Sequence, residues 1–308
     1  MRMSPTILTA RQIDVLLSHL PGVRDADVDH VHDARVATRR LRELLPLAGV
    51  ETGSSARKTS ELVRDAGRAL GTVRELDTLL VLCRDLGDAH PHAAGTLAMA
   101  RSRLQIDRGN AARRLVKRLE RLGIEQLREE IRPGRATFLT SPAPWRTACA
   151  DRLAARATKL GAAIAHASGV YLPNRLHRVR VHLKKLRYLA EIASETGLWQ
   201  PAHLRRDAAR VQEMLGDIHD RQVLLERLEQ DSSDAAVIDA LRAEIALRHA
   251  RYLTQRQRLS AMVDACHRFA EHERHRRRRL MSGAAAALLV PAGIALLRSP
   301  LLIDRDAA

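Results

Sequence analysis

Two short segments of the chain combine a histidine with basic residues at helical spacing. Residues 31–44 read VHDARVATRRLREL, and residues 176–189 read LHRVRVHLKKLRYL. On a helix, each segment places its histidine and three basic residues within roughly an 80° arc, opposite a stripe of apolar residues. The candidate binding residues are His32, Arg35, Arg39, Arg40, Arg42, His177, Arg180, Lys184, Lys185 and Arg187.

Such a ladder of basic side chains suits a flexible polymer of phosphates. Each guanidinium can donate two parallel hydrogen bonds to phosphate oxygens, whereas a lysine ammonium acts as a point charge. Successive phosphates can settle against successive side chains and release condensed counter-ions. His32 and His177 each lie near the expected start of a helix, where backbone N–H groups favour an anion, and we expect bound phosphate to promote their protonation.

Two other interpretations of the basic helices remain open. Each ladder could be only a solvated helix face, or the histidines could be buried hydrogen-bonding residues that lock helix packing. The repetition of the histidine and of three basic positions in both segments argues against solubility alone. The second alternative is compatible with Arg and Lys side chains that still bind phosphate.

The two segments belong to a longer internal repeat with an offset of 145 residues. At the same offset, residues 70–73 (LGTV) align with residues 215–218 (LGDI), and Glu75 aligns with Asp220. Two separate segments that share one ungapped offset indicate a duplication.

Apolar residues recur at three- and four-residue spacing along nearly the whole chain, and no alternating stretch indicates a sheet. The predicted fold class is all-α, with two tandem four-helix bundles related by the duplication and a basic groove or pore between them. We expect helices at about 9–20, 29–48, 54–87, 92–121, 143–168, 173–197, 201–230 and 234–270, the first ending at Pro21-Gly22. The expected units are repeat 1 at 5–132, a Pro-rich linker at 133–144, repeat 2 at 145–271, and an Arg-rich segment with an Ala- and Leu-rich tail at 272–308.

The chain of 308 residues carries 52 Lys and Arg against 36 Asp and Glu, a formal charge of +16. An excess of this size attracts polyanions over long range. Proteins that bind single-stranded nucleic acids commonly stack bases on aromatic side chains, and this chain has only 2 Phe, 2 Trp and 3 Tyr. The scarcity favours a phosphate chain without bases. A nucleic-acid or nucleoid-binding protein is kept as the alternative, because duplex DNA can be held by arginine alone.

Several further basic residues would extend such a surface. Each of them, taken singly, is more often ordinary surface than a binding residue, and Arg74 could instead pair with a carboxylate on its own helix. The additional candidates for phosphate contact are Arg74, Arg113, Arg114, Lys117, Arg206 and Arg210.

The duplicated motifs resemble those of the CHAD domain, an α-helical family named for its histidine. The family signature, His-x-x-Arg-Val-x-x-Arg-Arg-Leu-Arg, is similar to residues 32–42 and again to residues 177–187, where Lys184-Lys185 replace the arginine pair. The resemblance covers roughly residues 5–270. It implies two four-helix bundles around a basic groove or pore, binding of inorganic polyphosphate through the ladders, and association with polyphosphate granules. The lysine pair should weaken bidentate contacts without removing charge.

The sequence contains no phosphate-binding glycine loop, dinucleotide-binding turn or nucleophile elbow. His32-Asp33 together with His30 could suggest metal-dependent phosphohydrolase chemistry, but the position that matches Asp33 in the second copy is Arg178. We therefore expect a protein that is not an enzyme, with no catalytic residue, no metal and no cofactor. An accessory protein of a phosphohydrolase remains an alternative.

The expected location is the cytoplasm. The three cysteines form no Cys-x-x-Cys pair, which is typical of a reducing compartment, and the first residues lack the apolar run of a secretory signal. Residues 280–297 carry no charge and follow four arginines, so a membrane contact through a C-terminal tail anchor is weighed against a packed or surface-lying helix. Pro291 and an Ala-rich composition favour the latter. The sequence leaves the oligomeric state open.

Overall fold

The computed structural model describes residues 3–48, 54–124, 127, 142–231 and 234–296. Within these ranges the chain forms eight α-helices, one short 3-10 helix and no strand, which confirms the all-helical prediction. The helices are α1 (Pro5–Arg24), α2 (Val28–Leu47), α3 (Ser54–Ala89), η1 (Pro91–Ala93), α4 (Ala94–Leu122), α6 (Pro142–His166), α7 (Pro173–Glu195), α8 (Ala202–Asp231) and α9 (Ala235–Leu296).

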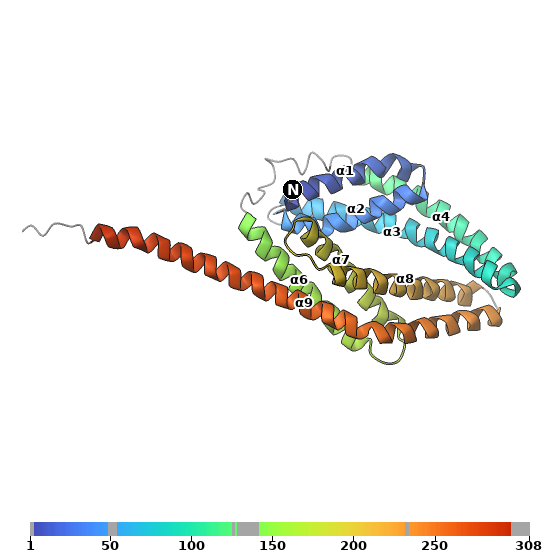
Figure 1. Ribbon diagram of the computed structural model, residues 1–308. Coiled ribbons are helices and arrows are strands. Elements are labelled where there is room, and N and C mark those ends of the chain that lie inside the picture. The colour runs from blue at the N-terminus through green and yellow to red at the C-terminus, as the bar shows by residue number, and fades with distance from the viewer. Residues whose placement is uncertain (1–2, 49–53, 125–126, 128–141, 232–233, 297–308) are drawn as a thin grey trace, which may run out of the picture.

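Contacts between helices fall mainly into two groups and a seam that joins them. In the first group, α1 packs against α2, α2 against α3, and α3 against α4. In the second group, α6 and α8 each pack against both α7 and α9. Across the seam α2 contacts α7 and α3 contacts α8, so these four helices occupy the middle of the molecule (Figure 1). The two helices that carry the basic ladders therefore lie next to each other.

Local signals at the helix starts fix where the two histidines lie. The side chain of Asp27 caps α2, because its Oδ1 atom accepts hydrogen bonds from the backbone N–H groups of Asp29 and His30 at 2.9 Å. Helix α7 begins at Pro173, whose fixed φ suits the first turn. Both starts place a histidine at the fifth position of its helix, within reach of the N-terminal end of the dipole.

Burial of the opposite stripe holds each ladder in place. On α2, residues Val31, Ala34, Thr38 and Leu41 are all fully buried, at the spacing expected of one helix face. On α7 the same role falls to Leu176, Val179, Leu183 and Leu186. The basic side chains lie on the opposite face of each helix and therefore point away from the apolar stripe, toward the seam or the regions beside it.

Two helices run further than the sequence indicated. Helix α1 continues through Pro21 to Arg24, contrary to the expected end at Pro21-Gly22. A proline this close to a helix end costs only one backbone hydrogen bond, so it need not stop the helix. Helix α9 continues past the expected end at residue 270 to Leu296. Residues 271–282 contain no proline or glycine and the arginine run has high helix propensity, which explains the first part of this extension but not the part that contains Gly283, Pro291 and Gly293.

In the part of the chain that the structure describes, we find no helix with the length and apolar character needed to cross a membrane. A membrane anchor was weighed for residues 280–297. From residue 283 on, the side chains of this segment lie outside the described residues. Most of the Pro-rich segment expected at 133–144 likewise lies outside them, and α6 begins at Pro142.

Ion pairs of low exposure connect α2 to the second group of helices. Arg40 on α2 donates from Nη2 to both carboxylate oxygens of Glu195 on α7, at 2.6 and 2.7 Å. Glu43, only 4% exposed, accepts hydrogen bonds from Arg152 at 3.3 Å and from Arg156 at 3.0 Å, both on α6. A buried carboxylate with two guanidinium partners is well compensated, but the two arginines depend on it in turn.

The substitution Glu43→Gln keeps the side-chain volume and removes the charge. We expect the free energy of unfolding to fall by about 2 kcal/mol, because the two arginines of α6 then lose a counter-ion in a partly desolvated place. Urea denaturation measures this change. The same substitution at Glu61, which is exposed on α3, is the control and should change stability by less than about 0.5 kcal/mol. Equal stabilities of the two variants would contradict the assignment.

Candidate functional site

A pocket with a cavity volume of about 140 Å³ lies between the four middle helices α2, α3, α7 and α8. We call it the central pocket. Its lining contains seven basic or basic-capable side chains and two carboxylates. The lining residues are His32, Arg35, Val36, Arg39, Arg74, Glu75, Thr78, Arg180, Lys184, His219 and Asp220.

The sequence repeat accounts for the composition of the central pocket. At the 145-residue offset, Arg35 corresponds to Arg180, Arg39 to Lys184, and Glu75 to Asp220, and all six line the pocket. His32 also lines it, whereas its counterpart His177 lies in a neighbouring pocket. The structure thus brings together five of the ten ladder residues, namely His32, Arg35, Arg39, Arg180 and Lys184, and adds Arg74 from the further candidates.

Several positively charged side chains lie close together in the central pocket, and the pKa values of two of them are lowered. Burial, followed by the charges of Arg39 and Arg180, lowers the pKa of Lys184 to about 6. Burial, again followed by Arg39 and Arg180, lowers the pKa of Arg35 to about 10. For both groups burial, which disfavours the charged form, is the largest cause, and repulsion from the neighbouring positive charges lowers the pKa further. An anion placed in the pocket would relieve that repulsion.

The histidines around the pocket are neutral at pH 7 in the unliganded protein. Burial and the charge of Arg180 lower the pKa of His219 to about 3. Partial burial, followed by Arg74 for His32 and by Arg180 for His177, lowers the pKa of these two histidines as well. Both side chains are exposed at the rim, so they are not the buried packing residues that the sequence left open.

Three ionisable pocket residues escaped the sequence analysis as site members. They are His219, Glu75 and Asp220, and only the last two were aligned as repeat partners. Asp220 lies 3.9 Å from Arg180, and burial raises its pKa against the opposing effect of that arginine. The repeat itself could have identified His219, because at the 145-residue offset it aligns with Arg74, which was a candidate for phosphate contact.

Two ladder residues are committed to helix packing instead of the pocket. Arg40 is held by Glu195, as described above. Arg187 donates from Nε to Gln212 on α8 at 2.8 Å and is paired with Glu191 one turn along α7. Both guanidinium groups therefore connect helices, and neither lines the central pocket.

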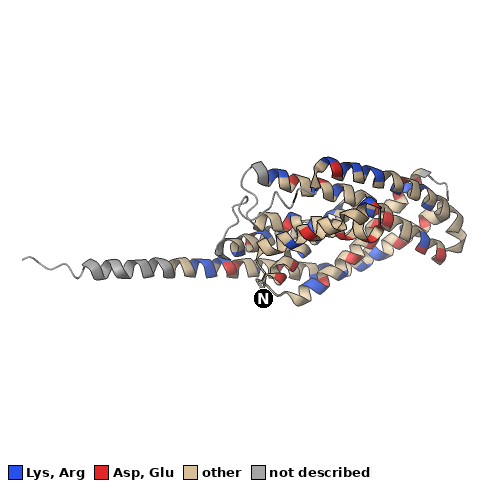
Figure 2. Cartoon of the chain, turned by 90° about the horizontal axis from the view of Figure 1, so that it is seen from above, with Lys and Arg blue, Asp and Glu red and all other residues tan. Residues whose placement is uncertain are grey.

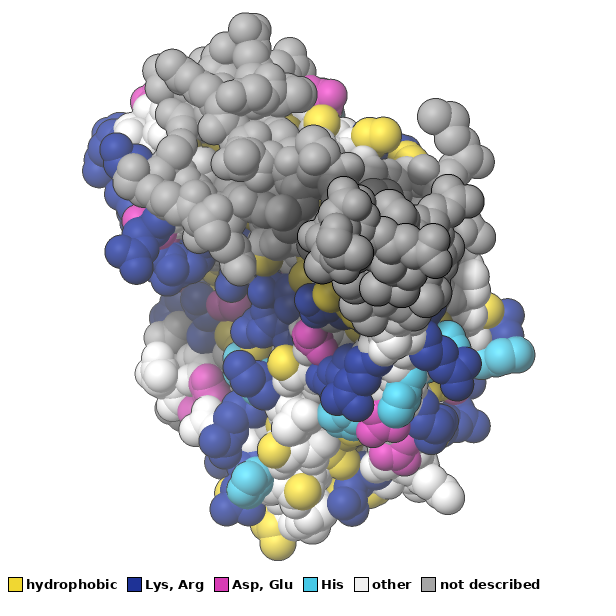
Figure 3. Space-filling view, turned by 90° about the vertical axis from the view of Figure 1, so that its left-hand side faces the viewer, with side chains coloured by type: hydrophobic (Ala, Val, Ile, Leu, Met, Phe, Trp, Pro, Cys, Tyr) yellow, Lys and Arg dark blue, Asp and Glu magenta, His cyan; other side chains and the backbone are white. Residues whose placement is uncertain are grey.

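Arg42 and Lys185 belong to a second basic cluster beside α6, which we call the α6 cluster. Burial lowers the pKa of Lys185, and the charges of Arg156 and Arg42 add to this effect. Lys159 adds to it as well, and Glu43 opposes it. Figure 3 shows Lys and Arg side chains gathered on the end of the molecule from which α9 protrudes.

The remaining candidates lie on the outer surface. Arg113, Arg114 and Lys117 on α4 are exposed, and so are Arg206 and Arg210 on α8. None of these five lines the central pocket. Lys and Arg occur along the whole helical body, mixed with Asp and Glu (Figure 2), so the charge excess extends well beyond the pocket.

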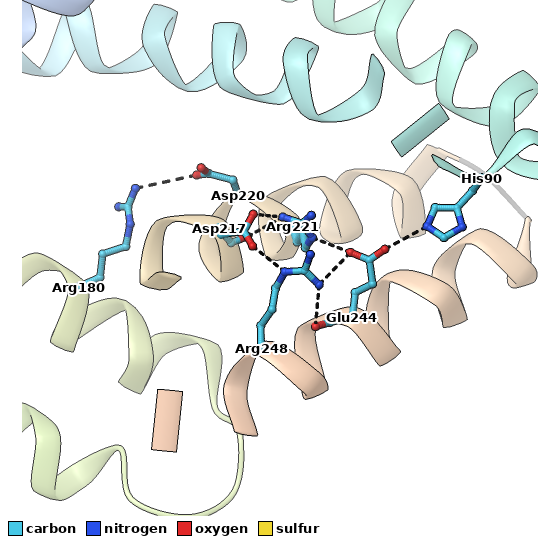
Figure 4. A network of polar contacts seen from close by, with 7 residues as sticks. All are labelled: His90, Arg180, Asp217, Asp220, Arg221, Glu244 and Arg248. Atoms are coloured by element: carbon cyan, nitrogen blue, oxygen red, sulfur yellow. Dashed lines mark hydrogen bonds and ion pairs between the residues drawn. The ribbon is translucent and has the colours of Figure 1, made fainter. Parts of the chain in front are cut away.

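A network of ion pairs supports the pocket from behind α8 (Figure 4). Asp217 pairs with Arg221 on its own helix and accepts a hydrogen bond from Arg248 on α9 at 2.6 Å. Glu244 on α9 accepts from Arg221 at 2.8 Å and lies 3.1 Å from Nε2 of His90, at the end of α3. These contacts connect α8 to α9, on the same stretch of α8 that carries His219 and Asp220.

Among the described residues, no group of three or more His, Cys, Asp and Glu side chains is placed to hold a metal ion. The three cysteines are buried, and burial raises the pKa of each thiol, to about 11 for Cys83 and about 12 for Cys149 and Cys266. These thiols are consequently poor nucleophiles at neutral pH.

The fold and the pocket define an all-helical chain with basic residues of two helices facing each other across a seam. The CHAD domain family matches residues 8–229, and the chain belongs to that family. Similar solved structures include the CHAD domain from the plant Ricinus communis, with a TM-score of 0.55, 21% identity, and coverage of 88% of this chain and 92% of that chain. PptA from Streptomyces chartreusis has a TM-score of 0.52 and 17% identity, with coverage of 86% and 96%. No curated protein matches the sequence.

The crowding of charge in the central pocket affects stability. In the folded protein the pKa of Lys184 is about 6, against an ordinary value of 10.5, so the unfolded chain binds more protons between these values. The free energy of unfolding therefore rises with pH in this range. At pH 7 we expect Lys184→Met to stabilise the protein by about 1–3 kcal/mol, because folding of the parent must deprotonate most of this lysine and methionine has no such cost.

This gain should shrink as the pH approaches 10, where the unfolded chain also loses the lysine proton. Urea denaturation at pH 7 and pH 9 measures both effects. Lys117→Met, at an exposed position on α4, is the matched control and should leave stability nearly unchanged. A Lys184→Met variant that is less stable than the parent at pH 7 would refute the crowding.

Proposed function

We propose that this protein binds inorganic polyphosphate, without catalysing its hydrolysis, in the central pocket and along the basic surface around it. The observation that carries the proposal is the crowding of Arg35, Arg39, Arg180 and Lys184 in one pocket with only Glu75 and Asp220 as counter-charge. Such an arrangement costs free energy in the empty protein and gains it back when an anion enters. The stability of the unliganded protein alone would not favour such a cluster of like charges.

The size of the pocket favours a single phosphate chain over a duplex. A cavity of about 140 Å³ between four helices has room for a few phosphate groups and cannot enclose a double helix. An extended chain of phosphates can enter and meet arginines from both α2 and α7. Guanidinium groups that converge from two sides can bind the same chain bidentately.

In this proposal the two tandem halves are duplicated four-helix bundles, and the seam between them is the basic groove expected from the sequence. The α6 cluster, with Arg42 and Lys185, extends the groove beyond the pocket. A polymer long enough to leave the pocket would then touch both basic regions at once, which raises its effective concentration at the second region. The chain would accordingly act in the cytoplasm, at polyphosphate granules.

The decisive experiment measures affinity for long-chain polyphosphate and for duplex DNA at equal phosphate concentration and at two salt concentrations. We expect preference for polyphosphate and a slope of log K against log salt of about −3.5, from the five Lys and Arg side chains of the pocket. Equal affinity for DNA would instead support the nucleic-acid alternative. Phosphate release during the incubation would support phosphohydrolase activity and refute a purely binding role.

Variants locate the binding. Replacing Arg35, Arg39 and Arg180 by Gln should weaken polyphosphate binding by at least about 100-fold, because each loses charge-assisted hydrogen bonds worth about 1.5–3 kcal/mol. Replacing Arg113, Arg114 and Lys117 by Gln removes the same charge from the outer face of α4 and should cost less than about threefold. Similar losses in the two variants would show that the charge of the whole protein, rather than the pocket, binds the polymer.

Binding should also take up protons. A phosphate chain beside Lys184 raises the pKa of that ammonium from about 6 toward its ordinary value, and it raises the pKa of the histidines in the same direction. Affinity should therefore increase as the pH falls from 8 to 6. Calorimetry in two buffers of different ionisation enthalpy counts the protons. Lys184→Arg keeps the charge and should reduce the uptake, whereas an unchanged proton count in that variant would exclude Lys184 as the acceptor.

A further inference from the structure

A second pocket adjoins the central pocket between α7, α8 and the residues just before α7. We call it the tyrosine pocket, and its cavity volume is about 230 Å³. It is lined by Tyr171, Pro173, Asn174, Leu176, His177, Leu215, Ile218, His219, Gln222, Val223 and Glu226.

The two pockets are connected through a pair of histidines. His219 lines both of them. The ring of His177, in the tyrosine pocket, lies 4.7 Å from the ring of His219, measured between centroids. A ligand with its phosphates among the arginines of the central pocket would therefore extend past these two rings into the tyrosine pocket.

The tyrosine pocket differs chemically from its neighbour. Its lining contains no lysine or arginine and includes the carboxylate of Glu226, so it is not suited to phosphate. Its floor is formed by the buried side chains of Leu176, Leu215 and Ile218. Flat rings and amide groups form the walls, which is the composition expected around a neutral, partly apolar, hydrogen-bonding group.

The amide at the back of the tyrosine pocket is oriented by its neighbours. The hydroxyl of Tyr171 donates to Oε1 of Gln222 at 2.9 Å, and Nε2 of Gln222 donates to Oε1 of Glu226 at 3.0 Å. These two bonds fix which end of the amide carries the donor. An oriented donor and acceptor beside two aromatic rings resembles the surroundings that proteins provide for a single nucleobase.

The opening of the tyrosine pocket is particular to the second half of the chain. At the 145-residue offset, Ala26 and Asp77 stand where the second half has Tyr171 and Gln222. In the first half Arg108 spans these two positions, donating to Oδ1 of Asp77 at 2.7 Å and to the backbone oxygen of Ala26 at 2.5 Å. The two positions are thus joined in both halves, through Arg108 in the first and by the Tyr171–Gln222 hydrogen bond in the second, where the tyrosine pocket lies beside that bond.

We propose that the tyrosine pocket holds the base of a nucleoside polyphosphate whose phosphates occupy the central pocket. The inference rests on the proposed function for its phosphate end and adds a second ligand class. One base needs only one or two rings to stack on, so the scarcity of aromatic residues, which disfavours a nucleic-acid polymer, does not disfavour this ligand. Because their pKa values are lowered, His177 and His219 present neutral rings that can stack or hydrogen-bond.

The test compares ATP with inorganic tripolyphosphate in the absence of divalent metal. Tripolyphosphate carries the greater charge, so electrostatics alone favour it. We expect ATP to bind at least about tenfold more tightly, from stacking and hydrogen bonding of the base. Saturation transfer from the protein to the adenine ring protons should be observed at the same time. ATP affinity equal to or below that of tripolyphosphate would overturn the inference.

Two variants place the base. Gln222→Leu and Tyr171→Ala should each remove most of the ATP advantage and leave tripolyphosphate affinity within about twofold. Gln105→Leu, the same change at an exposed position of α4, is the matched control and should alter neither affinity. An ATP advantage that persists in both pocket variants would place the base elsewhere and refute the assignment.

Long-chain polyphosphate measured on the same samples separates this inference from the proposed function. If long chains bind in the central pocket and ATP binds no more tightly than tripolyphosphate, the assignment of the tyrosine pocket to a base is wrong and the proposed function stands. If long chains do not bind, the proposed function fails, whatever the ATP comparison gives. Circular dichroism of each variant excludes loss of folding as the cause.

Discussion

The repulsion between like charges at the seam is the constraint on which the rest of the structure depends. Two unit charges 4 Å apart repel by about 4 kcal/mol at an effective dielectric constant of 20, and the central pocket gathers Arg35, Arg39, Arg180 and Lys184. The apolar faces of α2 and α7 must offset this cost, and both are fully buried along their length. The same packing that keeps the helices together therefore also keeps the charges from separating.

Counter-charge at the seam is placed where it supports the helices and leaves the pocket positive. Glu195 and Glu191 lie on α7 and neutralise Arg40 and Arg187, which connect helices. Glu43 likewise neutralises two arginines of α6. Among the described residues that line the pocket, Asp220 and Glu75 are the only carboxylates, and burial raises the pKa of Asp220 despite its arginine neighbour. The carboxylates thus contribute more to the packing of the helices than to neutralising the basic side chains of the central pocket.

The helices and the central part of the site could be predicted from the sequence, because both follow from local periodicity. The spacing of His32, Arg35 and Arg39 indicated one helix face, and the structure places all three in the pocket. The same reasoning included Arg187, whose partner Gln212 is 25 residues away on another helix. Helical spacing gives the direction of a side chain around its own axis, but which partner it meets depends on how the helices pack. The extension of α9 was missed for a related reason: a change in composition near residue 270 was read as a boundary, although nothing in it breaks a helix.

The two halves differ most in the layer just outside the pocket. Three pairs of pocket positions keep their charge class in both copies, namely Arg35 and Arg180, Arg39 and Lys184, and Glu75 and Asp220. One layer out, Asp217 and Arg221 of the ion-pair network replace Thr72 and Leu76 of the first half. In the proposed function, two basic faces of the same kind suffice to attract an anion, since charge acts without detailed shape. To select among anions, a protein must also contact the part of the ligand that is attached to the phosphates. The side chains that make such contacts need a cavity that the protein's own ion pairs do not fill. If the tyrosine pocket of the second half is such a cavity, selectivity can change there while the basic faces, and the packing that holds them together, remain as they are.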